Sequence, residues 1–203
     1  MSITLPKGNF EAYIFDCDGT LVDSMPLHHE AWNHSLRSSG TEWDLPEDYF
    51  YRTAGKSLHQ VIEELNEIYD ETLIPESVGV IKERFFHDRI TSLKAFPDVV
   101  GHLRDAHERG LPVAVASGSV REAVVRSLEV TGIADLIDVI VAAEDVARGK
   151  PAPDCFLLAA ERLRVRPQGC LVFEDGVAGQ EAAETCGMTT VMVDARRGVA
   201  KAH

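Results

Sequence analysis

Four short segments of this chain contain the residue types needed to handle a phosphate group. They are YIFDCDGT at 13–20, VASGS at 115–119, GKPAPD at 149–154 and VFEDGVAG at 172–179. Each lies where an apolar run gives way to polar and glycine residues, which is typical of the carboxyl end of a buried strand. In a parallel sheet these ends meet at one edge, where open α/β proteins bind ligands. We therefore expect four carboxylates, a hydroxyl and an ammonium to converge at one site.

The first segment supplies two candidate catalytic carboxylates, Asp16 and Asp18, followed by Gly19, which permits a tight turn. A carboxylate can attack phosphorus and hold the phosphoryl group as an aspartyl phosphate. A neighbouring carboxyl can protonate the leaving oxygen and later deprotonate the attacking water. An isolated DxDG segment is more often a helix N-cap and a turn, so the interpretation depends on the other three segments.

A second acidic pair, Glu174 and Asp175, ends a later predicted strand. Alone, it would be typical of a helix start, where acids interact favourably with the helix dipole. Placed opposite Asp16 and Asp18, however, the four carboxylates would repel one another unless a cation lay between them. Magnesium takes oxygen ligands and bridges to phosphate oxygens. We therefore expect a Mg²⁺ site formed by these two acidic pairs.

The remaining two segments supply groups that bind anions. Ser117 and Gly118 end a predicted strand and precede a helix, whose free N–H groups, together with the serine hydroxyl, can bind phosphate. Lys150 follows Gly149, and a fixed ammonium there would neutralise the oxygens of a transferring phosphoryl group. A single SGS turn or surface lysine is common, but the four segments in this order are specific.

Alternating strands and helices are predicted around these segments. Apolar, partly β-branched runs, typical of buried parallel strands, lie at 10–15, 112–116, 138–143, 170–174 and 189–193. Stretches of helical period separate the later runs, at 98–109, 120–131, 153–164 and 177–187. This alternation predicts an α/β fold with a doubly wound parallel sheet and a Rossmann-like core.

The interval from about residue 25 to residue 93 breaks this alternation. It contains three stretches of helical spacing, LHHEAWNHSLRSSG, SLHQVIEELNEIYDE and SVGVIKERFFHDRITSL, and no convincing strand. We expect residues 25–93 to form an inserted α-helical cap domain over the carboxyl edge of the sheet. Residues 1–24 and 94–203 would then form the catalytic core, with hinges at 20–26 and 92–97.

Composition limits the partners of this chain. Its formal net charge of −13 disfavours nucleic acid and anionic membrane surfaces, both of which are bound mainly through surplus Lys and Arg. Its N-terminal segment has no apolar stretch long enough for a signal peptide or a membrane span, and its four cysteines show no CxxC spacing. We expect a cytoplasmic monomer that acts on a small phosphorylated metabolite.

Two other classes of function fit less well. A zinc site in HHEAWNH is disfavoured, because His29, Glu30 and His34 have one residue too many for the HExxH pattern on one helical face. A non-catalytic phospho-receiver would also cluster acids, a hydroxyl and a lysine on a doubly wound sheet. Receivers, however, have no cap of this length after the first strand.

Over essentially its full length the chain resembles the haloacid dehalogenase superfamily of phosphotransferases, and within it the β-phosphoglucomutase-like subgroup. DCDGT, SGS, KPAPD and FEDGVAG match the four family motifs. The resemblance implies that Asp16 is the nucleophile and Asp18 the general acid/base, with His28 near the hinge helping to position Asp18. It further implies phosphate binding by Ser117 and Lys150, and magnesium ligation by Asp16, the Asp18 backbone carbonyl, Glu174 and Asp175.

The chain departs from the mutases of this subgroup in the cap. They have a basic residue just before a cap glycine and an Arg three positions after it, whereas here Ala54 precedes Gly55 and Leu58 occupies the later position. Without that Arg a bisphosphate intermediate loses a bidentate clamp, for which Lys56 is a flexible replacement. We therefore favour a Mg-dependent phosphatase that hydrolyses a small sugar or polyol phosphate monoester through an aspartyl-phosphate, similar to bacterial fructose-1-phosphate phosphatases. The alternative is a β-phosphoglucomutase-type hexose-phosphate isomerase.

Overall fold

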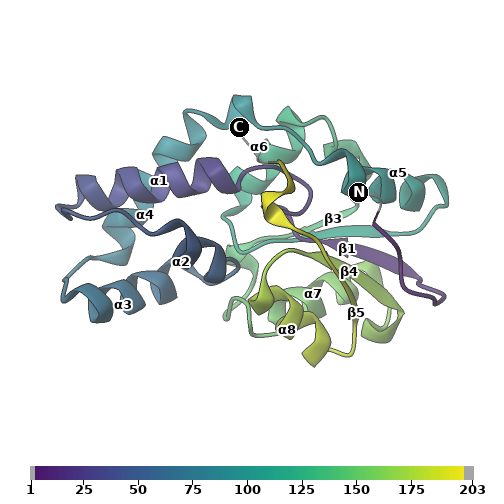
Figure 1. Cartoon of the computed structure of the whole chain (residues 1–203). Coiled ribbons are helices and arrows are strands. Elements are labelled where there is room, and N and C mark those ends of the chain that lie inside the picture. The colour runs from purple at the N-terminus through teal and green to yellow at the C-terminus, as the bar shows by residue number, and fades with distance from the viewer. Residues whose placement is uncertain (1–2, 199–203) are drawn as a thin grey trace.

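A parallel sheet of five strands forms the centre of the computed structural model, which describes residues 3–198. The strands are β1 Ala12–Phe15, β2 Val113–Ala116, β3 Val139–Val141, β4 Cys170–Glu174 and β5 Thr189–Met192. Their order across the sheet is β3-β2-β1-β4-β5 (Figure 1), so the chain builds outward from β1 on one side and then on the other. This confirms the expected doubly wound α/β fold. The outermost residues of the expected core, 1–2 and 199–203, lie outside the described residues.

Helices cover both faces of this sheet (Figure 1). They are α5 Pro97–Glu108 and α6 Arg121–Val130 on one face, and α7 Asp154–Leu163 and α8 Val177–Thr185 on the other. Successive side chains of a strand point to opposite faces, so Phe15 of β1 packs toward α5 while its neighbour Ile14 packs toward α7. The alternation of side chains along β1 therefore buries one set under α5 and α6 and the other set under α7 and α8.

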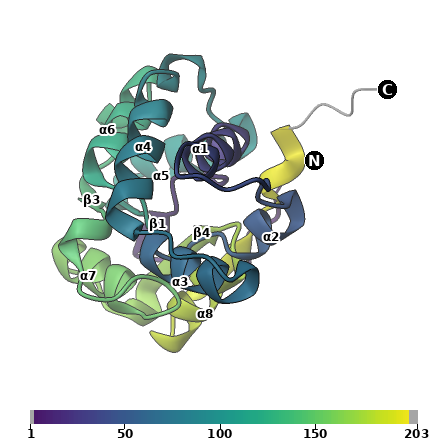
Figure 2. The same cartoon turned by 90° about the vertical axis from the view of Figure 1, so that its left-hand side faces the viewer.

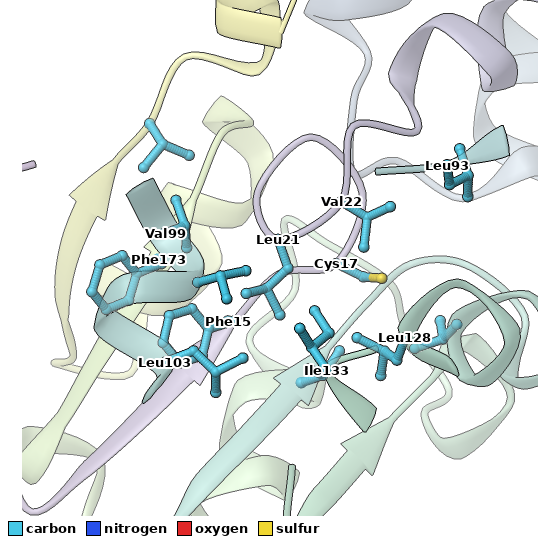
Figure 3. Packing of buried hydrophobic residues seen from close by; sticks show 14 of the residues in the cluster. Phe15, Cys17, Leu21, Val22, Leu93, Val99, Leu103, Leu128, Ile133 and Phe173 are labelled. Atoms are coloured by element: carbon cyan, nitrogen blue, oxygen red, sulfur yellow. The ribbon is translucent and has the colours of Figure 1, made fainter. Parts of the chain in front are cut away.

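Aromatic packing fixes the two central strands against each other. The ring of Phe15 stacks on that of Phe173 with centroids 4.6 Å apart, and Val99 and Leu103 of α5 belong to the same buried cluster (Figure 3). Burying each of these side chains contributes on the order of 2 kcal/mol to the free energy of folding. Asp16 and Glu174 lie at the ends of these same two strands, so this packing also positions the site.

Four helices lie beyond the carboxyl ends of the strands, apart from the sheet (Figures 1 and 2). They are α1 Met25–Ser38, α2 Glu47–Arg52, α3 Leu58–Tyr69 and α4 Pro75–His87, and we call them the cap. They share an apolar cluster of their own, which includes Trp32, Phe50 and Leu65. Helix α2 was not among the predicted helical stretches, because six residues are too few for a helical period to be recognised.

The cap joins the core through two connections that lie side by side. The Asp23 N–H donates to the Lys94 carbonyl at 2.8 Å, and the Phe96 N–H donates to the Leu21 carbonyl at 2.9 Å. Ladder-like hydrogen bonding of this kind aligns the entry and exit of the cap. Both pairs fall within or next to the expected hinges.

Five short 3₁₀ helices complete the described chain. They are η1 Ile90–Ser92, η2 Ala134–Leu136, η3 Ala143–Asp145, η4 Pro167–Gly169 and η5 Ala195–Gly198. The last of them contacts the cap: Ala195 is buried in the cap cluster, and Arg196 pairs with Asp48 of α2 at 2.7 Å. Among residues 3–198, no helix is long and apolar enough to cross a bilayer.

Candidate active site

A buried lysine lies between two carboxylates at the carboxyl ends of the central strands. The Lys150 ammonium donates to Asp16 Oδ1 at 2.7 Å and to Glu174 Oε1 at 2.6 Å, and the residue is only 1% exposed. Asp16 directly follows β1, and its N–H extends the ladder by donating to the Phe173 carbonyl at 2.9 Å. Regular sheet structure therefore positions both carboxylates, as the sequence predicted.

A third carboxylate, that of Asp175, completes a group that can hold a cation. Carboxylate oxygens of Asp16, Glu174 and Asp175 lie within 4.8 Å of one another. Asp175 Oδ1 accepts a hydrogen bond from the Thr20 hydroxyl at 3.0 Å. At Gly19, with a φ of +81°, an added Cβ would lie 2.4 Å from Asp175 Oδ2, so the two loops approach this closely only because residue 19 is glycine.

The electrostatics of this group favour a further positive charge. Burial is the main cause that raises the pKa of Asp16 to about 8; Glu174 and Asp18 add to it, and Lys150 offsets only part of it. Burial, Glu174 and Asp16 likewise raise the pKa of Asp175 well above its usual range. Three carboxylates around one ammonium thus fit a divalent cation, which would relieve their repulsion through oxygen ligands.

Backbone N–H groups hold the Glu174 side chain in one orientation. Glu174 Oε2 accepts from the N–H of Asp175 at 2.6 Å and from that of Gly176 at 3.0 Å. An added Cβ at Gly179, in the first turn of α8, would lie only 1.6 Å from Glu174 Oε1. The start of α8 is therefore shaped around this carboxylate.

The second carboxylate of the first motif, Asp18, lies in a different environment. Its Oδ1 accepts from the Ser24 hydroxyl at 2.6 Å and lies 3.0 Å from His28 Nε2, and its Oδ2 accepts from the Ser119 hydroxyl at 2.7 Å. Burial alone would raise the pKa of Asp18, but the nearby His28 and the hydrogen bonds from Ser119 and Ser24 outweigh it. They hold the pKa well below its usual range. Asp16 and Asp18 therefore differ in proton affinity.

The predicted phosphate-binding residues surround the same point. The Ser117 hydroxyl lies 3.5 Å from Asp18 Oδ2 and accepts from the Ser119 N–H at 3.0 Å. An added Cβ at Gly118 would lie 3.4 Å from the Gly55 carbonyl oxygen. The cap loop between α2 and α3 thus lies directly over the start of α6.

A cavity of about 860 Å³ lies between these core residues and the cap. The core contributes Asp16, Asp18, Ser117 and Lys150, and the cap contributes residues from all four of its helices and from the loop before α3. A cavity of this size accommodates a small metabolite. All of the predicted site residues line it: Asp16, Asp18, His28, Lys56, Ser117, Gly118, Lys150, Glu174 and Asp175.

One of the two predicted cap residues, Lys56, has a partner that the sequence analysis missed. Lys56 lines the cavity, but its ammonium donates to Glu64 at 2.5 Å, and Glu64 also accepts from the Tyr49 hydroxyl at 3.0 Å. For His28 the partner is Asp18, as the resemblance implied. No local pattern marks Glu64 as a partner of Lys56, because the pairing depends on how α3 turns back toward the loop.

A buried lysine of α4, Lys82, was also missed, although the sequence contains a signal for it. The buried positions of α4 are Val78, Lys82 and Phe86, four residues apart. A lysine in an apolar stripe of this spacing is rarely a solvent-facing residue. Ser24 and Ser119, which hold Asp18, gave no comparable signal, because hydroxyls in turns are common.

Together the fold and the site define an α/β enzyme with an acidic cluster, a buried lysine and a helical cap. A sequence profile of the haloacid dehalogenase-like hydrolases matches residues 10–187. The chain belongs to this family, and the expectation of a phosphoric monoester hydrolase of this type is confirmed.

Relatives and solved structures are similar over most of the chain. The chain is 32% identical to fructose-1-phosphate phosphatase YqaB of Escherichia coli (strain K12), over 91% of this chain and 96% of the relative. It is also 32% identical to a phosphorylated carbohydrates phosphatase of Thermotoga maritima, over 89% of this chain and 83% of the relative. Among solved structures, a β-phosphoglucomutase from Clostridium difficile matches with a TM-score of 0.80 and 25% identity, covering 89% of this chain and 83% of that one.

Proposed function

We propose that this protein is a Mg²⁺-dependent phosphatase that hydrolyses a small sugar or polyol phosphate monoester through an aspartyl-phosphate on Asp16. The observation that supports this most strongly is the placement of Asp16. It contacts Lys150, belongs to the acidic group with Glu174 and Asp175, and lies two residues before Asp18. Glu174 shares the first two features, but backbone N–H groups hold its second carboxylate oxygen. The phosphatases named above, which act on phosphorylated sugars, support the substrate class.

Magnesium would be held by Asp16, Glu174, Asp175 and the backbone carbonyl of Asp18. When bound, it would neutralise phosphate oxygens and the carboxylate that approaches them. Lys150 and the hydroxyl of Ser117 would bind the remaining phosphate oxygens, together with the N–H of Gly118. The negative charge of the whole chain makes these local positive groups necessary for binding an anion.

In the first step, a carboxylate oxygen of Asp16 attacks phosphorus, and the bond from phosphorus to the ester oxygen breaks. Asp18 gives its proton to the leaving oxygen, so the sugar departs as a neutral alcohol. The bound phosphate, as a neighbouring negative charge, raises the proton affinity of Asp18 at this stage. Sealing the cavity from bulk water preserves the intermediate until the alcohol has left.

In the second step, Asp18 takes a proton from a water molecule, which attacks phosphorus and releases Asp16 and inorganic phosphate. The hydrogen bonds from Ser24 and Ser119 favour the ionised form of Asp18, which is the form that this step requires. Asp18 thereby takes up again the proton that it gave in the first step, and it holds this proton while a phosphate group lies beside it. His28 would hold Asp18 in position throughout both steps.

Residues 25–93 form the cap domain in this proposal, and residues 1–24 and 94–203 form the catalytic core. The cap would open at the paired connections to admit substrate and close to bring the Gly55 loop over Ser117 and Lys150. Leu58, at the place of the mutases' Arg, packs toward Gly79 of α4, its side chain 3.4 Å from where a Cβ of that residue would lie. An apolar side chain here favours a phosphatase over a mutase, because nothing at this position clamps a second phosphate.

The test is phosphate release from a panel of phosphorylated sugars and polyols, for the wild type and for Asp16→Asn. We expect release that requires Mg²⁺ and is lost on chelation, and a fall of roughly 10⁴-fold or more in kcat for the variant, because the nucleophile is gone. Acid quenching should trap radiolabelled phosphate on the wild-type protein alone. Wild-type turnover by Asp16→Asn would refute the mechanism, and isomerisation of β-glucose 1-phosphate without phosphate release would favour the mutase.

A further inference from the structure

The part of the cavity that lies away from Asp16 and Lys150 differs in charge from the phosphate end. Apolar side chains form much of it, among them Trp32, Phe50 and Val61. They can pack against the carbon skeleton of a bound metabolite. The polar groups of this region must then recognise whatever the metabolite presents beyond its phosphate.

Each basic residue that the cap contributes to the lining already has an acidic partner. Lys56 contacts Glu64 at 2.5 Å, Lys82 contacts Glu83 at 2.7 Å, and His59 contacts Glu76 at 3.1 Å. The fourth, His28, contacts Asp18 at 3.0 Å. Within residues 3–198, these four and Lys150 are the basic residues that line the cavity.

Glu64 is held in its charged form beside Lys56. The hydrogen bond from Lys56 is the main cause that lowers the pKa of Glu64, and the hydrogen bond from the Tyr49 hydroxyl contributes. Lys82 is largely buried beside Glu83, with its ammonium 5.8 Å from the centre of the Trp32 ring. These contacts fix both ammonium groups next to negative charges.

Paired charges recognise hydroxyls better than anions. An ammonium has three N–H donors, so one that is bonded to a carboxylate still has donors for a hydroxyl oxygen, and the carboxylate can accept from a hydroxyl hydrogen. A second phosphate or a carboxylate of a ligand would meet the same donors, but it would be repelled by the adjacent glutamates. Pairing therefore removes the attraction that a free lysine would offer to an anion.

We infer that the cap side of this cavity selects phosphate monoesters whose far end carries hydroxyl groups and no second negative charge. The selecting pairs are Lys82–Glu83, both of which line the cavity, and Lys56–Glu64, in which the lysine lines the cavity and the glutamate pairs with it from outside the lining. The inference rests on the proposed phosphatase function and narrows its substrate class: monophosphates of neutral sugars and polyols are accepted, whereas bisphosphates and phosphorylated acids are rejected.

The test compares kcat/KM within matched pairs of compounds that differ in one charged group. Suitable pairs are glycerol 3-phosphate with 3-phosphoglycerate, and fructose 1-phosphate with fructose 1,6-bisphosphate. We expect the neutral-ended member of each pair to be preferred by roughly tenfold or more in the wild type. Glu64→Gln and Glu83→Gln, which free Lys56 and Lys82, should each shift this ratio toward the charged member by roughly threefold or more.

Glu63→Gln is the matched control, because Glu63 is exposed next to Glu64 on α3, whereas the ion pair with Lys56 is made by Glu64. It makes the same change of net charge and should leave the ratio unaltered. Equal or faster turnover of the charged members by the wild type would overturn the inference and leave the phosphatase intact. Turnover of p-nitrophenyl phosphate but of no sugar or polyol phosphate would do the same, whereas no turnover of any phosphomonoester would remove the proposed function as well.

Discussion

Lysines paired with carboxylates occur both in the core of this protein and in its cap, at nearly the same distances. Lys150 contacts Asp16 and Glu174 at 2.7 and 2.6 Å, and Lys56 contacts Glu64 at 2.5 Å. The side chain of Lys150, however, is 1% exposed, whereas that of Lys56 is 30% exposed. The two regions therefore make the same contact in environments of very different polarity.

This difference shows that burial, rather than distance, decides how much each ion pair contributes to the stability of the protein. Removing one member of a buried ion pair leaves an uncompensated charge without water, whereas a partly exposed pair is screened and contributes little to stability. The core pairs must therefore be complete before the chain is stable. The Lys56–Glu64 pair of the cap is partly exposed, so its residues can change with little loss of stability, which suits residues that recognise the variable part of a substrate.

Among the variants that test this difference, Lys150→Met is expected to change stability the most. This variant keeps the volume of the side chain but leaves Asp16 and Glu174 without their cation, and it should lower the free energy of unfolding by about 3 kcal/mol. Lys56→Met, the matched cap variant, should lower it by less than about 1 kcal/mol. Urea unfolding with a chelator present measures both, and equal losses for the two variants would contradict the role given to burial.

Gly179→Ala is expected to have a smaller effect, which is confined to the binding of Mg²⁺. The new methyl group would meet Glu174 Oε1, so the carboxylate must leave the N–H groups of Asp175 and Gly176. We expect the apparent affinity for Mg²⁺ to fall roughly tenfold, since a displaced ligand side chain loses its orientation. The Mg²⁺ dependence of activity and the rise in Tm on adding Mg²⁺ both report this change.

Gly101→Ala provides the control for this variant. Gly101 is also helical, in α5, and an added Cβ there would meet no heavy atom within 4 Å. This substitution should leave the Mg²⁺ dependence unchanged and slightly raise stability, because alanine favours a helix over glycine. A normal Mg²⁺ dependence in Gly179→Ala would show that Glu174 is not held as the structure indicates.

The two regions also differ in how much of them the sequence predicted. The core strands and the positions of Asp16, Ser117, Lys150 and Glu174 followed from apolar runs that end in polar residues, because topology brings all parallel strand ends to one edge. The resemblance to a family then assigned roles that residue types left open, such as which aspartate attacks. These roles, like the domain bounds, stay predictions.

The contacts of the cap could not be predicted in the same way. No strand register relates the cap helices, so the burial of Lys82 near Trp32 of α1 depends on interhelical packing that leaves only a weak periodic signal. The pairing of Lys56 with Glu64 depends on how the loop before α3 lies along that helix. The contact between Ala195 and the cap cluster could not be predicted either. It joins the end of the core to the cap across a long stretch of sequence: Asp48 and Arg196, which pair at the same place, are 148 residues apart.

The smallest effect is expected for a change at Arg196, where the core contacts the cap outside the hinges. Arg196 pairs with Asp48 of α2 and lies over the Tyr51 ring, 4.4 Å from its centre, on an exposed surface. Because water screens this contact, Arg196→Ala should leave urea unfolding unchanged. It should nevertheless raise KM by roughly twofold at constant kcat, because one contact that favours the closed cap is lost.

Arg126→Ala is the control for this last variant, since the exposed ion pair of Arg126 with Glu129 lies within α6 of the core. It should leave both KM and the unfolding curve unchanged. If Arg196→Ala behaved like this control, the C-terminal contact would have no part in cap closure, and the hinge and the Gly55 loop would control closure by themselves. If it instead destabilised the whole protein, the division into a stabilising core and an adjustable cap would fail at this point, because a screened surface pair would then act like the buried one at Lys150.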